Sequence, residues 1–137
     1  MDPQHRLWME ESWHALEDSG YTAKSLSGER CGVFIGVSSG DYSTHVEDQS
    51  ELDAQHLTGN SNSILSARLS YLLNLTGPAL AIDTACSSSL VAIAQACDSI
   101  VNEDCTVALA GGVSAITRPT LHIMTSKAGM LLSLIHI

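Results

Sequence analysis

The fold is decided by the stretch Ala81-Ile82-Asp83-Thr84-Ala85-Cys86-Ser87-Ser88-Ser89-Leu90. An apolar segment, Pro78–Ile82, stops there at a short polar turn. A thiol and three serines follow, and then a strongly apolar stretch that continues to Val101. A strand that turns directly into a helix is the unit from which parallel sheets are built. The sequence therefore places Cys86 at the point where a buried strand turns into a buried helix.

Cys86 lies at the expected start of that helix, where two interpretations are open. The first turn of a helix carries unpaired N–H groups and a partial positive charge. Both favour the thiolate, which is the nucleophilic form of cysteine. The same N–H groups can hold the oxyanion that forms when a thioester is attacked, as in the nucleophile turn of α/β-hydrolases. Alternatively, a lone cysteine among apolar neighbours is a small buried hydrophobe.

Helices and apolar strands are expected to alternate on both sides of this turn. Asp2-Pro3 is a typical helix start and Gly20 a typical stop, with Met9, Trp13 and Leu16 at helical spacing between them. The further elements expected are a core strand at Cys31–Val37, an irregular polar segment at Ser38–Gly59 with one helical turn near Asp41–Asp48, a helix at Ile64–Leu73, a buried strand at Pro78–Asp83, a helix at Ser87–Val101, a strand at Thr106–Val113 and a loop at Thr117–Met130. This alternation predicts an α/β fold with parallel pairing.

Composition limits the partners. The chain has 137 residues, 45% hydrophobic and 15% charged, which suits one buried α/β core. Its net charge of −9 argues against nucleic acid and anionic membranes as partners. The four cysteines show no C-x-x-C spacing, so no metal site is indicated. No signal peptide and no apolar run of membrane-spanning length is visible, so we expect a cytoplasmic protein.

The string DTACSSSL at Asp83–Leu90 resembles the active-site signature of β-ketoacyl synthases, specifically the ketosynthase domains of modular type I polyketide synthases. Similar stretches run along nearly the whole chain: Asp2–Leu7, Ala15–Tyr21, Gly32–Gly36, Ala67–Pro78, Ala108–Val113 and Ser126–Leu131. Two positions differ from the common pattern. Gln95 stands where many relatives have histidine, and Ala67 where many have glycine or asparagine.

The resemblance implies a thiolase-like fold, in which two duplicated α/β halves form an α-β-α-β-α layering. Residues 1–131 would be most of the N-terminal half, with an upstream strand expected before Met1. Residues 132–137 resemble the translation of a library adapter, and we expect them to be a non-native tail. The alternative is a natural apolar strand. Without the second half, the apolar surface of Leu90–Val101 is expected to be exposed.

The resemblance also implies the chemistry. Cys86 would accept an acyl chain from a thioester on the phosphopantetheine arm of an acyl carrier protein, and its backbone N–H would be one oxyanion donor. Decarboxylative Claisen condensation with a malonyl-type extender would follow. The family's His-Gly-Thr-Gly-Thr and Asn-x-Gly-His motifs do not occur here, so the chain alone is expected to be inactive. The parent would bind no further cofactor and would be a homodimer.

Other residues receive structural interpretations. The histidines, namely His5, His14, His45, His56, His122 and His136, are expected to be surface or packing residues. Asp83 and Thr84 are expected to bond the backbone of the turn rather than act as acid or base. Gly111-Gly112 is expected to allow close packing or a turn, and not to bind a phosphate. Two alternatives to a condensing-enzyme fragment stay open at this point. One is a self-contained cysteine hydrolase that uses Cys86 with a local histidine, and the other is a non-catalytic interaction domain.

Overall fold

The computed structural model describes residues 1–45 and 52–131. The elements are α1 (Pro3–Asp18), α2 (Ala23–Leu26), β1 (Cys31–Gly36), the 3-10 turn η1 (Tyr42–His45), α3 (Ala54–Asn60), α4 (Asn62–Leu73), β2 (Ala79–Ile82), the 3-10 turn η3 (Ala85–Ser87), α5 (Ser88–Val101), β3 (Val107–Gly112) and α6 (Thr120–Lys127). None of the helices in these two ranges is long and apolar enough to cross a membrane.

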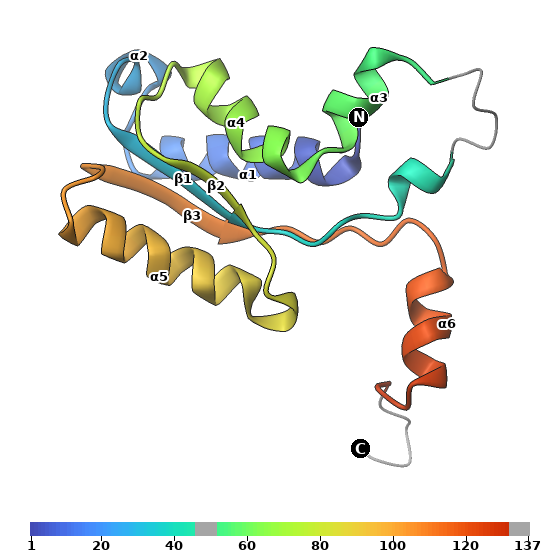
Figure 1. Cartoon of the computed structure of the whole chain (residues 1–137). Coiled ribbons are helices and arrows are strands. Elements are labelled where there is room, and N and C mark those ends of the chain that lie inside the picture. The colour runs from blue at the N-terminus through green and yellow to red at the C-terminus, as the bar shows by residue number, and fades with distance from the viewer. Residues whose placement is uncertain (46–51, 132–137) are drawn as a thin grey trace.

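Three parallel strands form the sheet, in the order β2-β1-β3. Val33 of β1 lies beside Ala79 of β2, and Cys31 lies beside Val107 of β3. The chain passes from β1 to β2 through α4 on one face of the sheet, and from β2 to β3 through α5 on the other (Figure 1). The predicted α/β architecture with parallel pairing is therefore confirmed.

The face that α1 and α4 cover is packed with large side chains on both sides of the interface. Every second residue of β1 points to it, so Val33 and Ile35 are fully buried there. The helices contribute Trp8 and Leu16 from α1 and Leu65, Leu69 and Leu73 from α4. Asn74 ends α4 in a left-handed conformation, with a φ of 53°. This face holds the main hydrophobic core.

The face that α5 covers is built from small residues. Phe34 is the one large β1 side chain in its buried cluster, and it packs with Ala92, Ala96 and Cys105. The residues of α5 that are buried are Ser88, Ala92, Ala96 and Ser99. The large apolar residues of α5 lie on its outer side, where Leu90 and Val101 are exposed, as expected for this stretch. Small side chains let this helix lie close to the sheet.

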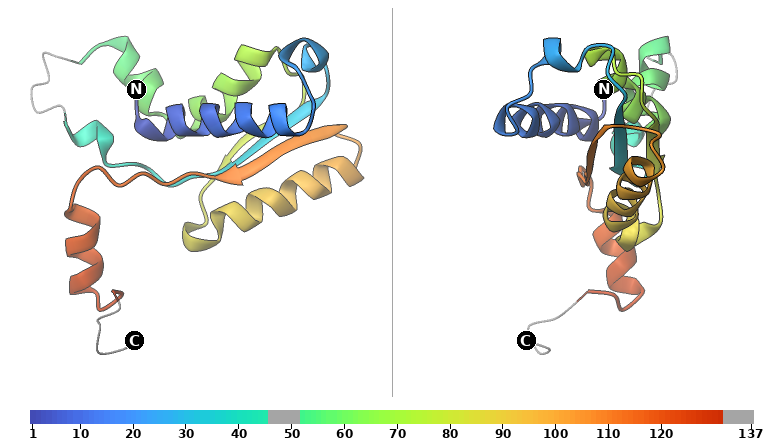
Figure 2. Two further views of the ribbon diagram at one scale, coloured as in Figure 1. Left: turned by 180° about the vertical axis from the view of Figure 1, so that it is seen from behind. Right: turned by 90° about the vertical axis from the view of Figure 1, so that its left-hand side faces the viewer.

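Several expectations need correction. The Ser38–Gly59 segment was expected to be irregular, but it contains most of the helix α3, which begins after an Asp53 cap. The helical turn expected near Asp41–Asp48 is the shorter η1. Residues 46–51 lie outside the described residues. The expected loop at Thr117–Met130 contains α6, which stands apart from the sheet (Figure 2). On α1 the buried face passes through Trp8, one position from the expected Met9, and Trp13 is exposed. The strand at Ala79–Ile82 is only partly buried because it lies at the sheet edge.

Candidate active site around Cys86

The carboxyl ends of the three strands meet at one edge of the sheet. Gly36 at the end of β1 pairs with Ile82 of β2 and with Gly112 of β3. The turn that holds Cys86 follows β2 directly, so the thiol lies at this edge, where α/β sheets usually bind ligands. Cys86 is exposed, and it lines an open pocket of about 610 Å3. The pocket is lined by Gly36, Val37, Ser38, Ala85, Cys86, Ser88, Ser89, Ile93, Gly111, Gly112, Val113 and Ser114.

The turn before α5 is held by its own side chains. Ala85 adopts a left-handed conformation with a φ of 54°. The Ser88 hydroxyl accepts a hydrogen bond from the Thr84 N–H at 2.8 Å and donates one to the Ala85 carbonyl at 2.6 Å. Ser87 donates from its hydroxyl to the Thr84 carbonyl at 2.8 Å and makes no side-chain cap on α5. The serines next to Cys86 therefore shape the turn.

Asp83 joins the Cys86 turn to the loop after β1. Its Oδ1 accepts a hydrogen bond from the Ala85 N–H at 3.1 Å and another from the Ser38 hydroxyl at 2.9 Å. These contacts agree with the expectation that Asp83 bonds the turn. The sequence did not identify Ser38 as its partner, because the two residues lie 45 positions apart.

Glycines at the strand ends let the start of α5 approach the sheet. A Cβ atom on Gly36 would lie 2.5 Å from the backbone carbonyl carbon of Ser88 and from the nitrogen of Ser89. A Cβ atom on Gly112 would lie 2.8 Å from the Cβ of Ser89. Both positions therefore exclude a side chain, and the expectation of close packing at Gly111-Gly112 is confirmed. These contacts fix where the residues after Cys86 begin their helix.

The other three thiols have different surroundings. Cys31 and Cys105 are buried, and burial together with the neighbouring Cys105 thiol raises the pKa of Cys31 to about 11. Cys31 is therefore a neutral core residue at physiological pH. Cys97 is exposed on α5 and is not among the residues that line the pocket at Cys86.

The histidines lie in different parts of the chain. His5 is buried, His14, His45 and His122 are exposed, and His56 bonds the Asp53 carboxylate at 2.8 Å; His136 lies outside the described residues. Among the described residues that line the pocket around Cys86, none is a histidine. Within residues 1–45 and 52–131, the geometry thus places no histidine base beside Cys86 of the kind that a self-contained cysteine hydrolase would use.

A second carboxylate ties together the loops that follow β1 and β3. Asp41 accepts hydrogen bonds from the Thr117 N–H at 3.0 Å, from the Thr117 hydroxyl and from the Arg118 N–H at 2.8 Å. These donors lower the pKa of the Asp41 carboxyl below its ordinary value, the Thr117 hydroxyl having the largest effect. Sequence reasoning missed Asp41, because a partner 76 positions away leaves no local pattern.

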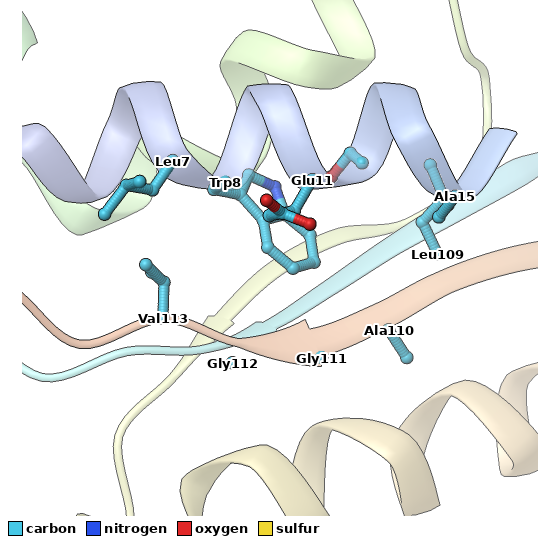
Figure 3. Close-up of a pocket in the computed structure, with 10 residues that line it drawn as sticks. Leu7, Trp8, Glu11, Ala15, Leu109, Ala110, Gly111, Gly112 and Val113 are labelled. Atoms are coloured by element: carbon cyan, nitrogen blue, oxygen red, sulfur yellow. The ribbon is translucent and has the colours of Figure 1, made fainter. Parts of the chain in front are cut away.

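Another pocket, of about 240 Å3, lies on the α1 side of β3. The Trp8 ring extends from α1 toward Gly111 (Figure 3), and a Cβ on that glycine would lie 3.3 Å from the ring. Within the described part of the chain, Trp8 Nε1 and Ser12 Oγ are buried there without a hydrogen-bond partner. Glu11 is the charged residue in its lining, which contains no thiol. The pocket at Cys86 is therefore the stronger candidate for covalent chemistry.

Comparisons with known proteins agree with the geometry. The family described as "Beta-ketoacyl synthase, N-terminal domain" matches residues 1–134. Polyketide synthase PksL of Bacillus subtilis is 46% identical over 131 residues, which cover 96% of this chain and 3% of that protein. Polyketide synthase PksN of the same organism is 47% identical over 132 residues, which cover 96% of this chain and 2% of that protein. The chain thus spans a small part of these relatives.

Solved structures give the same result. The ketosynthase from module 6 of the Bacillus subtilis bacillaene synthase is similar with a TM-score of 0.84 and 44% identity, over 96% of this chain and 22% of that one. An oxazolomycin ketosynthase domain from Streptomyces albus is similar with a TM-score of 0.80 and 38% identity, over 95% of this chain and 22% of that one. The expected thiolase-like fold is confirmed by these neighbours. The expected tail at residues 132–137 lies outside the described residues.

Proposed function

The chain belongs to the β-ketoacyl synthase family through its N-terminal domain, and on this premise we propose that Cys86 is the acyl-accepting nucleophile of a polyketide-type condensing enzyme. One observation supports the proposal most strongly. Cys86 is exposed in an open pocket at the carboxyl edge of the sheet, on a turn that leads directly into α5. The proposed domain spans residues 1–131.

In the first half-reaction the Cys86 thiolate attacks the carbonyl carbon of an acyl thioester. The oxyanion that forms is stabilised by backbone N–H donors, of which the Cys86 N–H is one. Collapse of the tetrahedral intermediate breaks the bond to the pantetheine sulfur, which leaves and takes up a proton. The acyl group is then held on Cys86 as a thioester.

In the second half-reaction a malonyl-type extender loses carbon dioxide, and the electron pair of the broken bond forms an enolate. The enolate carbon attacks the acyl carbonyl on Cys86. The Cys86 sulfur leaves as a thiolate, and the product is a β-ketoacyl thioester. Enolate stabilisation requires donors such as histidines, which the proposal assigns to the part of the protein outside this chain. The chain alone is therefore proposed to be inactive.

The proposed partner is an acyl carrier protein, because the acyl chain and the extender would each arrive on a phosphopantetheine arm. Glycines and serines form much of the lining of the open pocket beside Cys86, and their small size leaves room for a thioester arm next to the thiol. The complete protein is proposed to be a homodimer, as in the family that the sequence resembles.

Acyl loading tests the proposal. The complete ketosynthase that contains this chain is incubated with a short acyl thioester of N-acetylcysteamine, and its peptides are mapped by mass spectrometry. We expect the acyl mass on the peptide with Cys86, none at that position after Cys86→Ala, and unchanged loading after the matched change Cys97→Ala. Loading that survives Cys86→Ala would contradict the proposal, and thioester turnover by the isolated chain would contradict its catalytic incompleteness.

A further inference from the structure

The residue before Cys86 has a conformation that its side chain disfavours. Ala85 has a φ of 54°, in the left-handed region where a Cβ atom is crowded by the neighbouring backbone. Glycine occupies this region without that cost, but alanine needs interactions that hold it there. Because Cys86 is the next residue, the direction in which its thiol leaves the turn depends on Ala85.

Asp83 supplies such an interaction. Its Oδ1 accepts the Ala85 N–H at 3.1 Å, and a carboxylate is a stronger acceptor than a neutral group. The same oxygen accepts the Ser38 hydroxyl at 2.9 Å, so it bridges the turn and the loop after β1.

The loop that contains Ser38 is in turn attached to the body of the domain. The Ser38 carbonyl accepts a hydrogen bond from Gln4 Nε2 at 3.4 Å, and the Gln4 side chain is buried at the start of α1. Gln4 Oε1 also accepts the Ala115 N–H at 3.3 Å, from the segment after β3. The chain of contacts therefore runs from α1 through Ser38 and Asp83 to Ala85.

We infer that Asp83 is a positioning residue, which holds Ala85 in its left-handed conformation against Ser38 and thereby fixes the Cys86 thiol at the start of α5. The inference deepens the proposed function and rests on it. Asp83 acts here through the geometry of its two hydrogen bonds. An asparagine at position 83 keeps the acceptor oxygen, so it should position Ala85 as well as Asp83 does. A glycine at position 85 adopts the left-handed conformation without help, so the Asp83 hydrogen bond should then no longer be needed.

The test measures how fast Cys86 reacts with iodoacetamide relative to Cys97, the other exposed thiol, in the full chain. Peptide mass spectrometry gives both rates in one sample, so Cys97 serves as an internal reference. Four variants are compared with the unchanged chain: Asp83→Ala, Asp83→Asn, Ser38→Ala and the double variant Asp83→Ala with Ala85→Gly. A thermal melt of each variant shows that it is folded.

We expect Asp83→Ala to lower the Cys86-to-Cys97 rate ratio at least about threefold, because without this hydrogen bond Ala85 no longer fixes the direction in which the Cys86 thiol leaves the turn. Ser38→Ala should lower it less. Asp83→Asn should keep the ratio within about twofold of the unchanged chain, since asparagine still accepts both hydrogen bonds. The double variant should return to the original ratio.

Three results would overturn the inference: an unchanged ratio in Asp83→Ala, an equal loss in Asp83→Asn, or no recovery with glycine. If Asp83→Ala does not fold, Ser38→Ala decides, and an unchanged ratio there overturns the inference. Iodoacetamide labelling involves no acyl transfer, so the positioning role of Asp83 can be rejected independently of the acyl-accepting role of Cys86. If the complete, unchanged protein does not become acylated, the proposed function is rejected. The iodoacetamide rates of the variants still decide whether Asp83 positions the Cys86 turn.

Discussion

The two faces of the sheet are built on different principles. Toward α1 and α4, residues such as Leu69 and Ile35 interdigitate as large side chains and close a core. Toward α5, the contacts are made by small residues such as Ala92, and a glycine at the strand end lies against the helix backbone. Figure 1 shows both layers against the same strands.

This difference suggests that one face of the sheet stabilises the fold and the other positions Cys86. Large buried side chains contribute most of the hydrophobic free energy, so the α1–α4 face should determine whether the chain folds. Small residues contribute less area but fix the distance between backbones. The α5 face should therefore determine where the helix begins, and with it the place of Cys86.

The largest effect is expected from truncation in the α4 layer. Leu69 is 1% exposed, and Leu69→Ala should lower the free energy of unfolding by about 3 kcal/mol because it leaves a cavity. Leu72, on the same helix, is 58% exposed, and Leu72→Ala should change stability by less than about 0.5 kcal/mol. Urea denaturation of both variants measures the difference. Equal losses would show that this face is not the main core.

Glycine substitutions probe the α5 face directly. A Cβ at Gly36 would meet the α5 backbone at 2.5 Å, so Gly36→Ala should cost about 1–3 kcal/mol and shift the labelling rate of Cys86. The matched control is Gly77→Ala, whose Cβ would meet the Cys31 backbone at 2.5 Å, at the opposite end of the strands from Cys86. We expect it to leave the Cys86 rate unchanged. If Gly36→Ala leaves the labelling rate of Cys86 unchanged, packing of α5 against the sheet does not position Cys86.

The free energy of unfolding is expected to depend on pH through His5, which is buried on α1. Burial lowers the pKa of His5 below its ordinary value of 6.5, and the nearby Arg68 charge adds to the effect. The unfolded chain therefore binds a proton that the folded chain excludes, and stability should fall as the pH drops below 6.5 toward the folded pKa. His5→Gln should weaken this fall between pH 7.5 and 5.5 in urea denaturation, and the exposed His14→Gln serves as its control. If His5→Gln loses as much stability at low pH as the unchanged chain does, other groups cause the loss.

The smallest effect on stability is expected on the outer side of α5. Leu90 is 70% exposed, so Leu90→Ser should change the free energy of unfolding by less than about 0.5 kcal/mol. Aggregation should decrease, because an exposed apolar patch becomes smaller. Light scattering and denaturation together test this. A large loss of stability would mean that Leu90 belongs to the core of the chain.

The sequence predicted the elements with strong patterns. The continuous apolar run at Cys31–Val37 and the apolar stretch after Cys86 correspond to β1 and α5. The short helices α3 and α6 were missed because they lack a regular apolar face. Their caps were the available signals, namely Asp53 before α3 and Pro119 before α6.

The candidate site was predicted in part. Local sequence identified Cys86 and the turn around it, because the strand, the serines and the helix are contiguous. The partners of Asp83 and Asp41 lie 45 and 76 positions away, so only the folded chain brings them together. The inward face of α5 was also hidden, since alanines and serines give a weak hydrophobic pattern beside Leu90 and Ile93.

The central claim is that the Cys86 sulfur carries the growing chain, and one substitution in the complete ketosynthase tests it most directly. Product formation from an acyl thioester and a malonyl extender on a carrier protein is followed by mass spectrometry for the unchanged enzyme and for Cys86→Ser. We expect the β-ketoacyl product to be lost in the variant while its melting temperature stays the same. Extension that continues at the original rate in Cys86→Ser would contradict the claim.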